Sequence, residues 1–180
     1  MSFDERLIRG KVAESAIARW LMRKGWAVLP AYEVETGSYK GPQFYRTNAS
    51  FATPDMLACR HKDERWTTAW IEAKHKTAFS WYRIGGYWCT GIDLRNYMDY
   101  QSVAIHSPWP VWLLFLHRGG QAKDSPAESP SGLYGHKLEH LVNHESHRSE
   151  RHAGGMVYWA ESTLSKIAEL EEVISEDPTC

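Results

Sequence analysis

The sequence predicts an α/β fold in which a mixed central β-sheet is flanked by helices. Apolar residues recur at helical spacing near the start of the chain, whereas later segments show the shorter apolar runs of strands. The order of these segments is helix, three strands, helix and strand, which supplies helices for both faces of one sheet. The segments span residues 4–24, 26–34, 56–60, 67–75, 93–106 and 111–116.

The first helix is predicted from apolar residues that share one of its sides. These residues are Leu7, Ile8, Val12, Ala16, Ile17, Trp20 and Leu21. Gly25 is expected to end the helix, because glycine readily takes the left-handed conformation that follows a helix end. The strand at 26–34 follows, and a loop rich in Gly, Ser and Pro is expected over 36–48.

The next two strands are expected to form an antiparallel hairpin. Residues 56–60 and 67–75 are separated by the charged segment HKDER, which is typical of a turn. The aromatic, glycine-containing stretch 79–88 is interpreted as a loop. The helix at 93–106 and a buried strand at 111–116, behind the turn-forming Pro110, complete the predicted core.

The last third of the chain has weaker patterns. Residues 119–132 have the composition of a solvated loop, and the polar, histidine-rich segment 133–152 receives no assignment. An edge strand is expected at 156–160, followed by a helix from about Ser162 with Leu164, Ile167 and Leu170 on one side.

Length and composition indicate a single domain. The chain has 180 residues, so we expect one unit with a core at about 4–118 and a C-terminal extension at about 119–180. Its three cysteines are scattered, and its first residues are charged, which favours a cytoplasmic protein with no membrane span. The net charge of −1 hides an asymmetry, since residues 1–90 carry 14 basic and 9 acidic side chains, or +5.

The chemistry is predicted from Thr53-Pro54-Asp55 followed by Glu72-Ala73-Lys74. Side chains alternate along a strand, so Glu72 and Lys74 should point to the same face. Asp55 opens the neighbouring strand of the hairpin, which can bring both carboxylates together. A hard divalent cation, Mg²⁺ or Mn²⁺, would relieve their repulsion, and the carbonyl of Ala73 could be a further ligand. The alternative is a surface hairpin with a solvated salt bridge.

These residues resemble the PD-(D/E)XK nuclease superfamily, which includes restriction endonucleases and archaeal-type Holliday junction resolvases. The resemblance extends to Gly10-Lys11-Val12-Ala13-Glu14 and to the turn Gly25-Trp26-Ala27-Val28. It implies a restriction-endonuclease-like αβββαβ core and Mg²⁺-dependent cleavage of DNA, with Asp55 and Glu72 as metal ligands and Lys74 as the residue that positions the nucleophile.

The same resemblance implies roles for residues outside the hairpin. Glu14 would help to hold the metal or its water, and Gln101, or Tyr100 beside it, would be the polar residue on the second helix. A structure-selective, junction-resolvase-like endonuclease is favoured within the superfamily. Resolvases of this type act as dimers, so a homodimer is expected from the resemblance, although no interface signature is visible in the sequence.

Several residues near the motif are candidates for DNA contacts. Trp81 and Tyr82 could stack on exposed bases or cap the sheet as part of a satellite core. The cations that could contact phosphates are Lys76, Arg83, Lys40 and Arg46.

Two other functions are weighed against DNA cleavage. A catalytically idle nuclease fold could serve as a DNA-binding or protein-interaction module. A zinc peptidase is suggested by His136-Lys137-Leu138-Glu139-His140, with His144 on the same side of a helix, but no third ligand stands at a credible distance.

Overall fold

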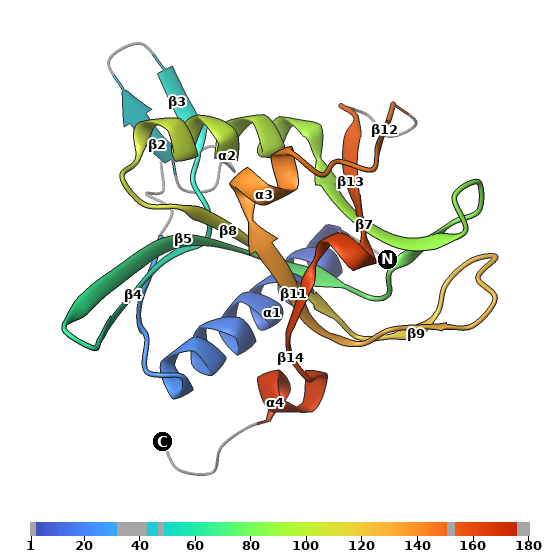
Figure 1. Ribbon diagram of the computed structural model, residues 1–180, viewed down its shortest axis with the longest axis horizontal. Helices are drawn as coiled ribbons and strands as arrows, with labels where there is room; N and C mark the ends of the chain where they lie inside the picture. Colours follow the sequence, from blue (N-terminus) through green and yellow to red (C-terminus); the bar gives the residue numbers. More distant parts are fainter. Residues whose placement is uncertain (1–2, 32–42, 47–48, 151–153, 176–180) are drawn as a thin grey trace.

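The computed structural model describes residues 3–31, 43–46, 49–150 and 154–175 of the chain, with the side chains of residues 3–10 and of Arg46 left undescribed. Its centre is a six-stranded sheet (Figure 1). In spatial order the strands are β1 (Ala27–Pro30), β4 (Met56–Lys62), β5 (Arg65–Lys76), β8 (Val111–His117), β11 (Gly132–Lys137) and β14 (Ser165–Ala168).

The central sheet is mixed, as predicted. Strand β5 pairs with β4 antiparallel and with β8 parallel, while the other pairs in this sheet are antiparallel. A parallel pair requires a crossover, which here contains helix α2 (Leu94–His106). The expected restriction-endonuclease-like order αβββαβ is therefore confirmed by α1 (Phe3–Arg23), β1, β4, β5, α2 and β8, with the small β2–β3 and β6–β7 hairpins inserted.

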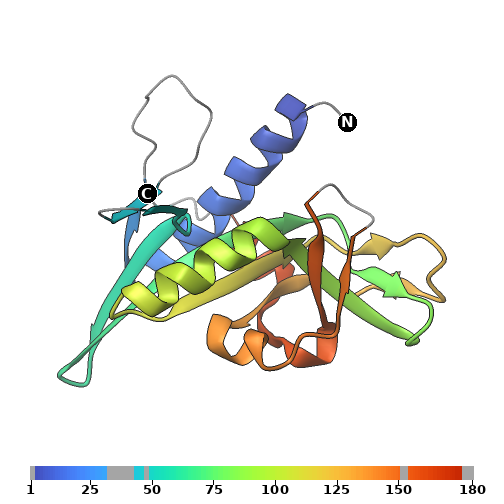
Figure 2. The same ribbon diagram turned by 90° about the horizontal axis from the view of Figure 1, so that it is seen from above.

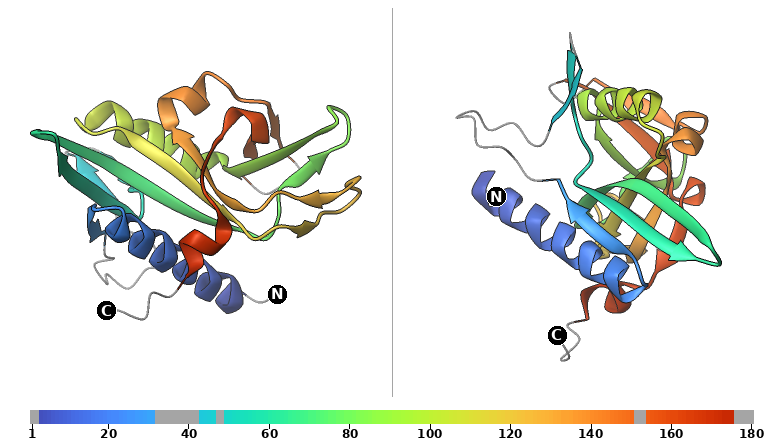
Figure 3. Two further views of the ribbon diagram at one scale, coloured as in Figure 1. Left: turned by 60° about the horizontal axis from the view of Figure 1, so that its bottom comes forward. Right: turned by 90° about the vertical axis from the view of Figure 1, so that its left-hand side faces the viewer.

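Helices cover both faces of the central sheet (Figures 1 and 3). Helix α1 and the short α4 (Leu170–Ile174) lie on one face, and α2 and α3 (Leu138–Val142) lie on the other. Strand β8 shows why both faces can be buried, because its side chains alternate between the two cores. Leu114 and Leu116 pack with α1, whereas Leu113 and Phe115 pack with α2 and α3.

A second sheet stands beside the central one, and its strands were not all expected. Its order is β12 (His147–Ser149), β13 (Met156–Ala160), β7 (Tyr87–Asp93) and β6 (Ser80–Tyr82), as Figure 2 shows from above. The prediction of a loop at 79–88 was wrong, because these residues form most of the β6–β7 hairpin. The strand expected at 156–160 is confirmed as β13, but its expected edge position was wrong, since β13 pairs with a strand on each side.

The predicted terminal helix was wrong as well. Residues 161–168 form a 3₁₀ turn (Glu161–Thr163) and then β14, which pairs with β11, and only Leu170–Ile174 are helical. The helical spacing of Leu164 and Ile167 was misleading, because the two side chains enter different cores on opposite faces of the sheet. Strand pairing thus overrides a weak local pattern.

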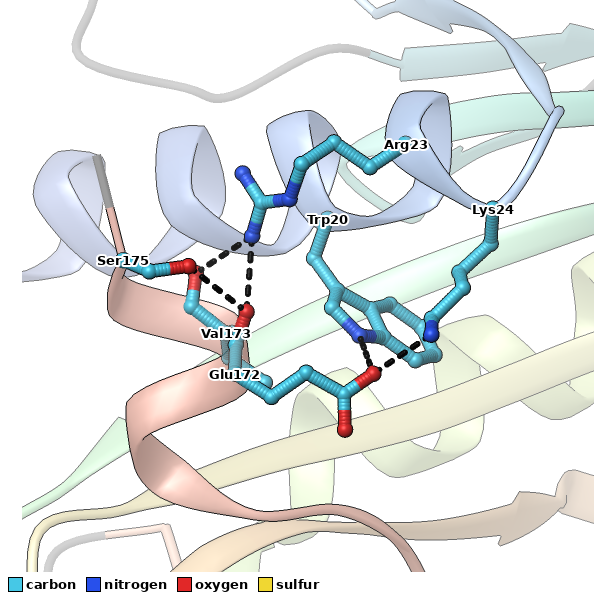
Figure 4. A network of polar contacts seen from close by, with 6 residues as sticks. All are labelled: Trp20, Arg23, Lys24, Glu172, Val173 and Ser175. Carbon is cyan, nitrogen blue, oxygen red and sulfur yellow. Dashed lines mark hydrogen bonds and ion pairs between the residues drawn. The ribbon is translucent and has the colours of Figure 1, made fainter. Parts of the chain in front are cut away.

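Helix α4 is held against α1 by contacts between residues far apart in the sequence (Figure 4). Glu172 accepts a hydrogen bond from the indole of Trp20 (3.2 Å) and forms an ion pair with Lys24 (2.6 Å). The Arg23 guanidinium donates to the carbonyls of Glu172 (2.8 Å) and Val173 (3.3 Å), which satisfies carbonyls at the end of α4.

Two small hairpins complete the described structure. Strands β2 (Gln43–Arg46) and β3 (Ala49–Ala52) form one hairpin, and β9 (Gly120–Gln121) and β10 (Glu128–Ser129) form another within the expected solvated loop. The C-terminal residues contribute β11 and β14 to the same central sheet as the expected core. Within the described ranges, no helix is both long enough and apolar enough to cross a membrane.

Candidate active site

The β4–β5 hairpin brings the motif residues together at one end of the central sheet. Its turn is tight, with Asp63 and Glu64 both at positive φ (51° and 58°), and it sets Met56 opposite Ile71. Asp55, which immediately precedes β4, therefore lies beside the next residues of β5. One Asp55 carboxylate oxygen (Oδ2) accepts a hydrogen bond from the main-chain amide of Ala73 at 2.7 Å. This bond fixes the carboxylate next to Glu72.

Glu72 is a buried carboxylate on β5, an inner strand of the sheet. Only 1% of its surface is exposed; it pairs with Leu113 of β8 and lies one residue beyond the Met56–Ile71 pair that ends the β4 ladder. Its carboxylate forms an ion pair with Lys74, whose side chain is 29% exposed. Apart from Lys74 and the nearby Tyr100 hydroxyl, its oxygens have no hydrogen-bond donor among the described residues. Burying a charge with so few partners costs free energy, so its presence here indicates a functional requirement.

The electrostatics of the group depart strongly from those of solvated side chains. Burial, reinforced by the Glu72 charge, raises the pKa of Asp55 to about 8. Burial acts to lower the pKa of Lys74, but the opposing charges of Glu72 and Asp55 outweigh it, so the pKa of the ammonium is raised. Lys74 thus remains a cation, and the site has too little positive charge for its carboxylates.

Glu14 reaches the same site from helix α1. The helix packs through Ala13 and Ile17 against the apolar side of β5, and Glu14 lies half-buried between these contacts. Burial raises the pKa of the Glu14 carboxyl, while Lys74 lowers it and Glu72 raises it further. These influences place Glu14 within electrostatic reach of both motif residues.

Helix α2 presents Tyr100, rather than Gln101, to the buried carboxylate. Tyr100 is only 3% exposed, and its pKa is raised by burial and then by the charge and proximity of Glu72. Gln101 is half-buried and interacts with Tyr97, whose hydroxyl donates to Glu145 at 2.6 Å. The helix was predicted from periodicity, but which of the adjacent residues faces β5 depends on how α2 docks.

The donor set fits a hard divalent cation. Magnesium is commonly held by one or two carboxylates and keeps several waters, which matches Asp55 and Glu72 with the carbonyl of Ala73 as a further oxygen. The described residues contain no group of three or more His, Cys, Asp or Glu side chains arranged to hold a metal by themselves. The raised pKa of Asp55 and the few partners of Glu72 both indicate a need for additional positive charge.

The predicted DNA contacts lie in different places. Lys76 points to the same face of β5 as Lys74, and its ammonium donates to the carbonyl of Gly91 at 2.6 Å. Burial and the Lys74 charge lower the pKa of Lys76 to about 8. Trp81, Tyr82 and Arg83 lie on the β6–β7 hairpin beyond the end of β5. Lys40 and the side chain of Arg46 lie outside the described part of the structure.

The histidines of the C-terminal region stack instead of converging on a metal. The rings of His136 and His140 lie 3.7 Å apart and nearly parallel, and those of His140 and His144 lie 4.1 Å apart. One nitrogen of His144 is already engaged with the carbonyl of His140 at 2.8 Å. Nothing in this ring stack favours a zinc peptidase.

No family model and no curated protein matches the chain. The structures found include Hjc, a Holliday junction resolvase from Archaeoglobus fulgidus, with 14% identity and a TM-score of 0.49 over 86% of this chain and 90% of that chain. Another is D212, a nuclease from a fusselovirus, with 12% identity and a TM-score of 0.41 over 94% of this chain and 86% of that chain. Because both identities are so low, the chemistry of this chain rests on its own residues.

Proposed function

We propose that this chain is a metal-dependent deoxyribonuclease that hydrolyses phosphodiester bonds at the Asp55–Glu72–Lys74 site. The observation that carries the proposal is Glu72, a 1% exposed carboxylate on an inner strand of the central sheet, grouped with a second carboxylate and a lysine. A structural role would be served better by apolar residues at this place, since a buried ion pair seldom adds net stability.

The residues suited to hold Mg²⁺ or Mn²⁺ are Asp55 and Glu72, with the carbonyl of Ala73. Such an ion, when bound, supplies Lewis-acid polarisation of the phosphate and lowers the pKa of a bound water. Asp55 is oriented for this task by the Ala73 amide, and the backbone of Glu72 is held by its pairing with Leu113 of β8. Rigid ligands cost little reorganisation during the reaction.

Lys74 acts on the reacting phosphate. Its raised pKa keeps the ammonium protonated throughout the physiological range. The ammonium can therefore orient the attacking water or offset the negative charge that builds up as the water oxygen bonds to phosphorus and the P–O bond to the leaving group breaks. Glu14, whose pKa is raised by its partial burial, would hold the water or take up its proton.

A cleavage assay with matched variants tests the proposal. Labelled branched, linear duplex and single-stranded DNA are incubated with the full chain in Mg²⁺ or in EDTA. We expect cleavage only with Mg²⁺, and a loss of about 10²-fold or more for Glu72→Gln. The control is Glu64→Gln, the same change at the exposed turn of the same hairpin.

The outcome of this assay separates the candidate activities. Equal cutting by Glu72→Gln and Glu64→Gln would exclude this site as the catalytic centre. Binding of DNA without any metal-dependent cutting would instead identify an idle nuclease fold. Faster cutting of branched than of linear DNA would support the finer, junction-resolvase-like proposal.

A further inference from the structure

A groove opens directly beyond the catalytic strand. Its volume is about 950 Å³, which is at the upper end of the range for small-molecule sites. Three parts of the chain line it: residues 77–84 with the first half of the β6–β7 hairpin, residues 122–124, and residues 147–149 of β12. Tyr158 of β13 and Cys89 of β7 complete its walls.

One wall of the groove is a set of stacked aromatic rings. The His147 ring lies between Tyr82, at 4.2 Å, and Tyr158, at 4.7 Å, and is nearly parallel to both. Trp81 lines the groove from the same hairpin and is held edge-to-face by Trp88 at 5.1 Å. These rings are ordered before any ligand binds, so a flat ligand would not have to immobilise them.

The groove also carries more positive than negative charge. Its charged lining residues are Arg83, Lys123, Arg148 and Asp124. Arg83 is 73% exposed, and its ion pair with Asp124 is long, at 3.5 Å, so the guanidinium can be recruited by another anion at little cost. Arg148 is held by two hydrogen bonds to Glu145, at 2.8 and 2.9 Å.

The groove begins at the end of the strand that carries the candidate active site. Strand β5 carries Glu72 and Lys74 and ends at Lys76, and the next residue, Thr77, lines the groove. The Lys76 ammonium also joins the two regions, because it donates to Gly91 on β7, the strand paired with the aromatic β6. A polymer with one phosphate at Lys74 would therefore need only a short stretch of its chain to reach the groove.

We propose that this groove binds a short single-stranded DNA segment that adjoins the cleavage site. Aromatic faces with nearby cations suit unpaired nucleotides, whose bases stack on the rings while their phosphates meet the cations. Paired bases already stack on one another inside a duplex and cannot do this. The inference rests on the proposed nuclease function and specifies its substrate as DNA with a single-stranded segment.

The test measures binding without cleavage. Fluorescence anisotropy follows a labelled oligothymidine, and separately a blunt duplex of the same length, with the full chain in EDTA. We expect the single strand to bind more tightly, and Trp81→Ala to weaken its binding about 5- to 150-fold, the range for losing one base stack. Trp81→Phe should retain most of the affinity, because it keeps an aromatic ring.

Trp66→Ala and Arg65→Glu are control variants, and Arg83→Glu is a second test variant. Trp66→Ala removes a tryptophan that is 72% exposed at the opposite end of β5, and it should leave the affinity unchanged. Arg83→Glu changes a largely exposed residue at the hairpin tip, so it should fold, and it should weaken binding and reduce its salt dependence. The matched change Arg65→Glu, at the β4–β5 turn, should do neither.

The result that would overturn the groove proposal is distinct from failure of the nuclease. Equal affinity for duplex and single strand, or unchanged binding by both Trp81→Ala and Arg83→Glu, would exclude the groove as a single-strand site even if Glu72→Gln abolishes cutting. Groove-dependent binding together with cutting that does not depend on Glu72 would refute the nuclease assignment and leave the groove as a binding site.

Discussion

Strand β5 has ionisable residues at or near both of its ends, and the two ends differ in how deeply these charged side chains are buried. At the start of the strand, Lys62 of the paired β4 and Arg65 are exposed beside a tight two-residue turn. At the other end, Glu72 is 1% exposed and Lys76 is half-buried, and both pair with residues of the buried strand β8. The same hairpin thus contains a solvated and a desolvated set of charges.

The difference shows why a Glu-x-Lys pattern indicates a functional site only where its charged side chains are buried. Charges at the turn interact with water and need no further explanation, whereas charges in the interior cost free energy that a purely structural hairpin would avoid. The pKa values of Asp55 and Lys76 are shifted at the buried end, where Glu14 and Tyr100 approach from two different helices. Such clusters are typical of functional sites.

The largest expected effect is on catalysis, and it contrasts Lys74 with Lys62, one lysine from each end of the hairpin. Lys74→Met should reduce the rate of DNA cleavage about 10²- to 10³-fold, because it removes the cation beside the reacting phosphate. Lys62→Met at the exposed end should change the rate less than about two-fold. Single-turnover cleavage under saturating protein measures both. Equal rates for the two variants would mean that the ends of β5 do not differ functionally.

The second effect links stability to the metal. Asp55→Asn removes a carboxyl that burial and Glu72 hold at a pKa of about 8, so the variant should be more stable than the wild type in EDTA near pH 8.5 by about 1–3 kcal/mol. Mg²⁺ should stabilise the wild type and have little effect on the variant. Urea unfolding with and without Mg²⁺ measures both. A variant that is less stable than the wild type in EDTA would contradict this electrostatic account.

The third effect is a pH dependence at Lys76. Its pKa is lowered from 10.5 to about 8, so the folded protein favours the neutral amine more than the unfolded chain does. This contribution to stability is full above pH 10.5 and is lost as pH falls from 10.5 to 8. Relative to Lys76→Met, the wild type should therefore be less stable at pH 7 than at pH 10, by about 1–2 kcal/mol. Urea unfolding at the two pH values would detect the difference, and a constant gap would contradict it.

The smallest effect is expected at the turn end. Arg65→Ala removes an exposed cation and should change the free energy of unfolding by less than about 0.5 kcal/mol. The same urea titration measures it. A loss of 2 kcal/mol or so would place Arg65 among the structurally engaged charges and remove the contrast between the ends.

Much of the core was predictable because its patterns are local. The first helix, the β4–β5 hairpin, α2 and β8 all appear at their expected places, with ends that differ by a few residues. The predictions for 79–88 and for the terminal helix were wrong because those segments are defined by distant partners. The β6–β7 hairpin extends a sheet that also contains β13, and β14 completes the central sheet beside β11.

The sequence alone determined that Glu72 and Lys74 share a face of one strand and that Asp55 precedes its neighbour, because strand alternation and a tight turn are set by adjacent residues. Only the tertiary structure decided that Tyr100 and Glu14 approach these residues, and that aromatic rings from β6, β12 and β13 stack beside the end of β5. Those contacts join residues far apart in the chain. They depend on how whole helices and sheets pack, which no local pattern records.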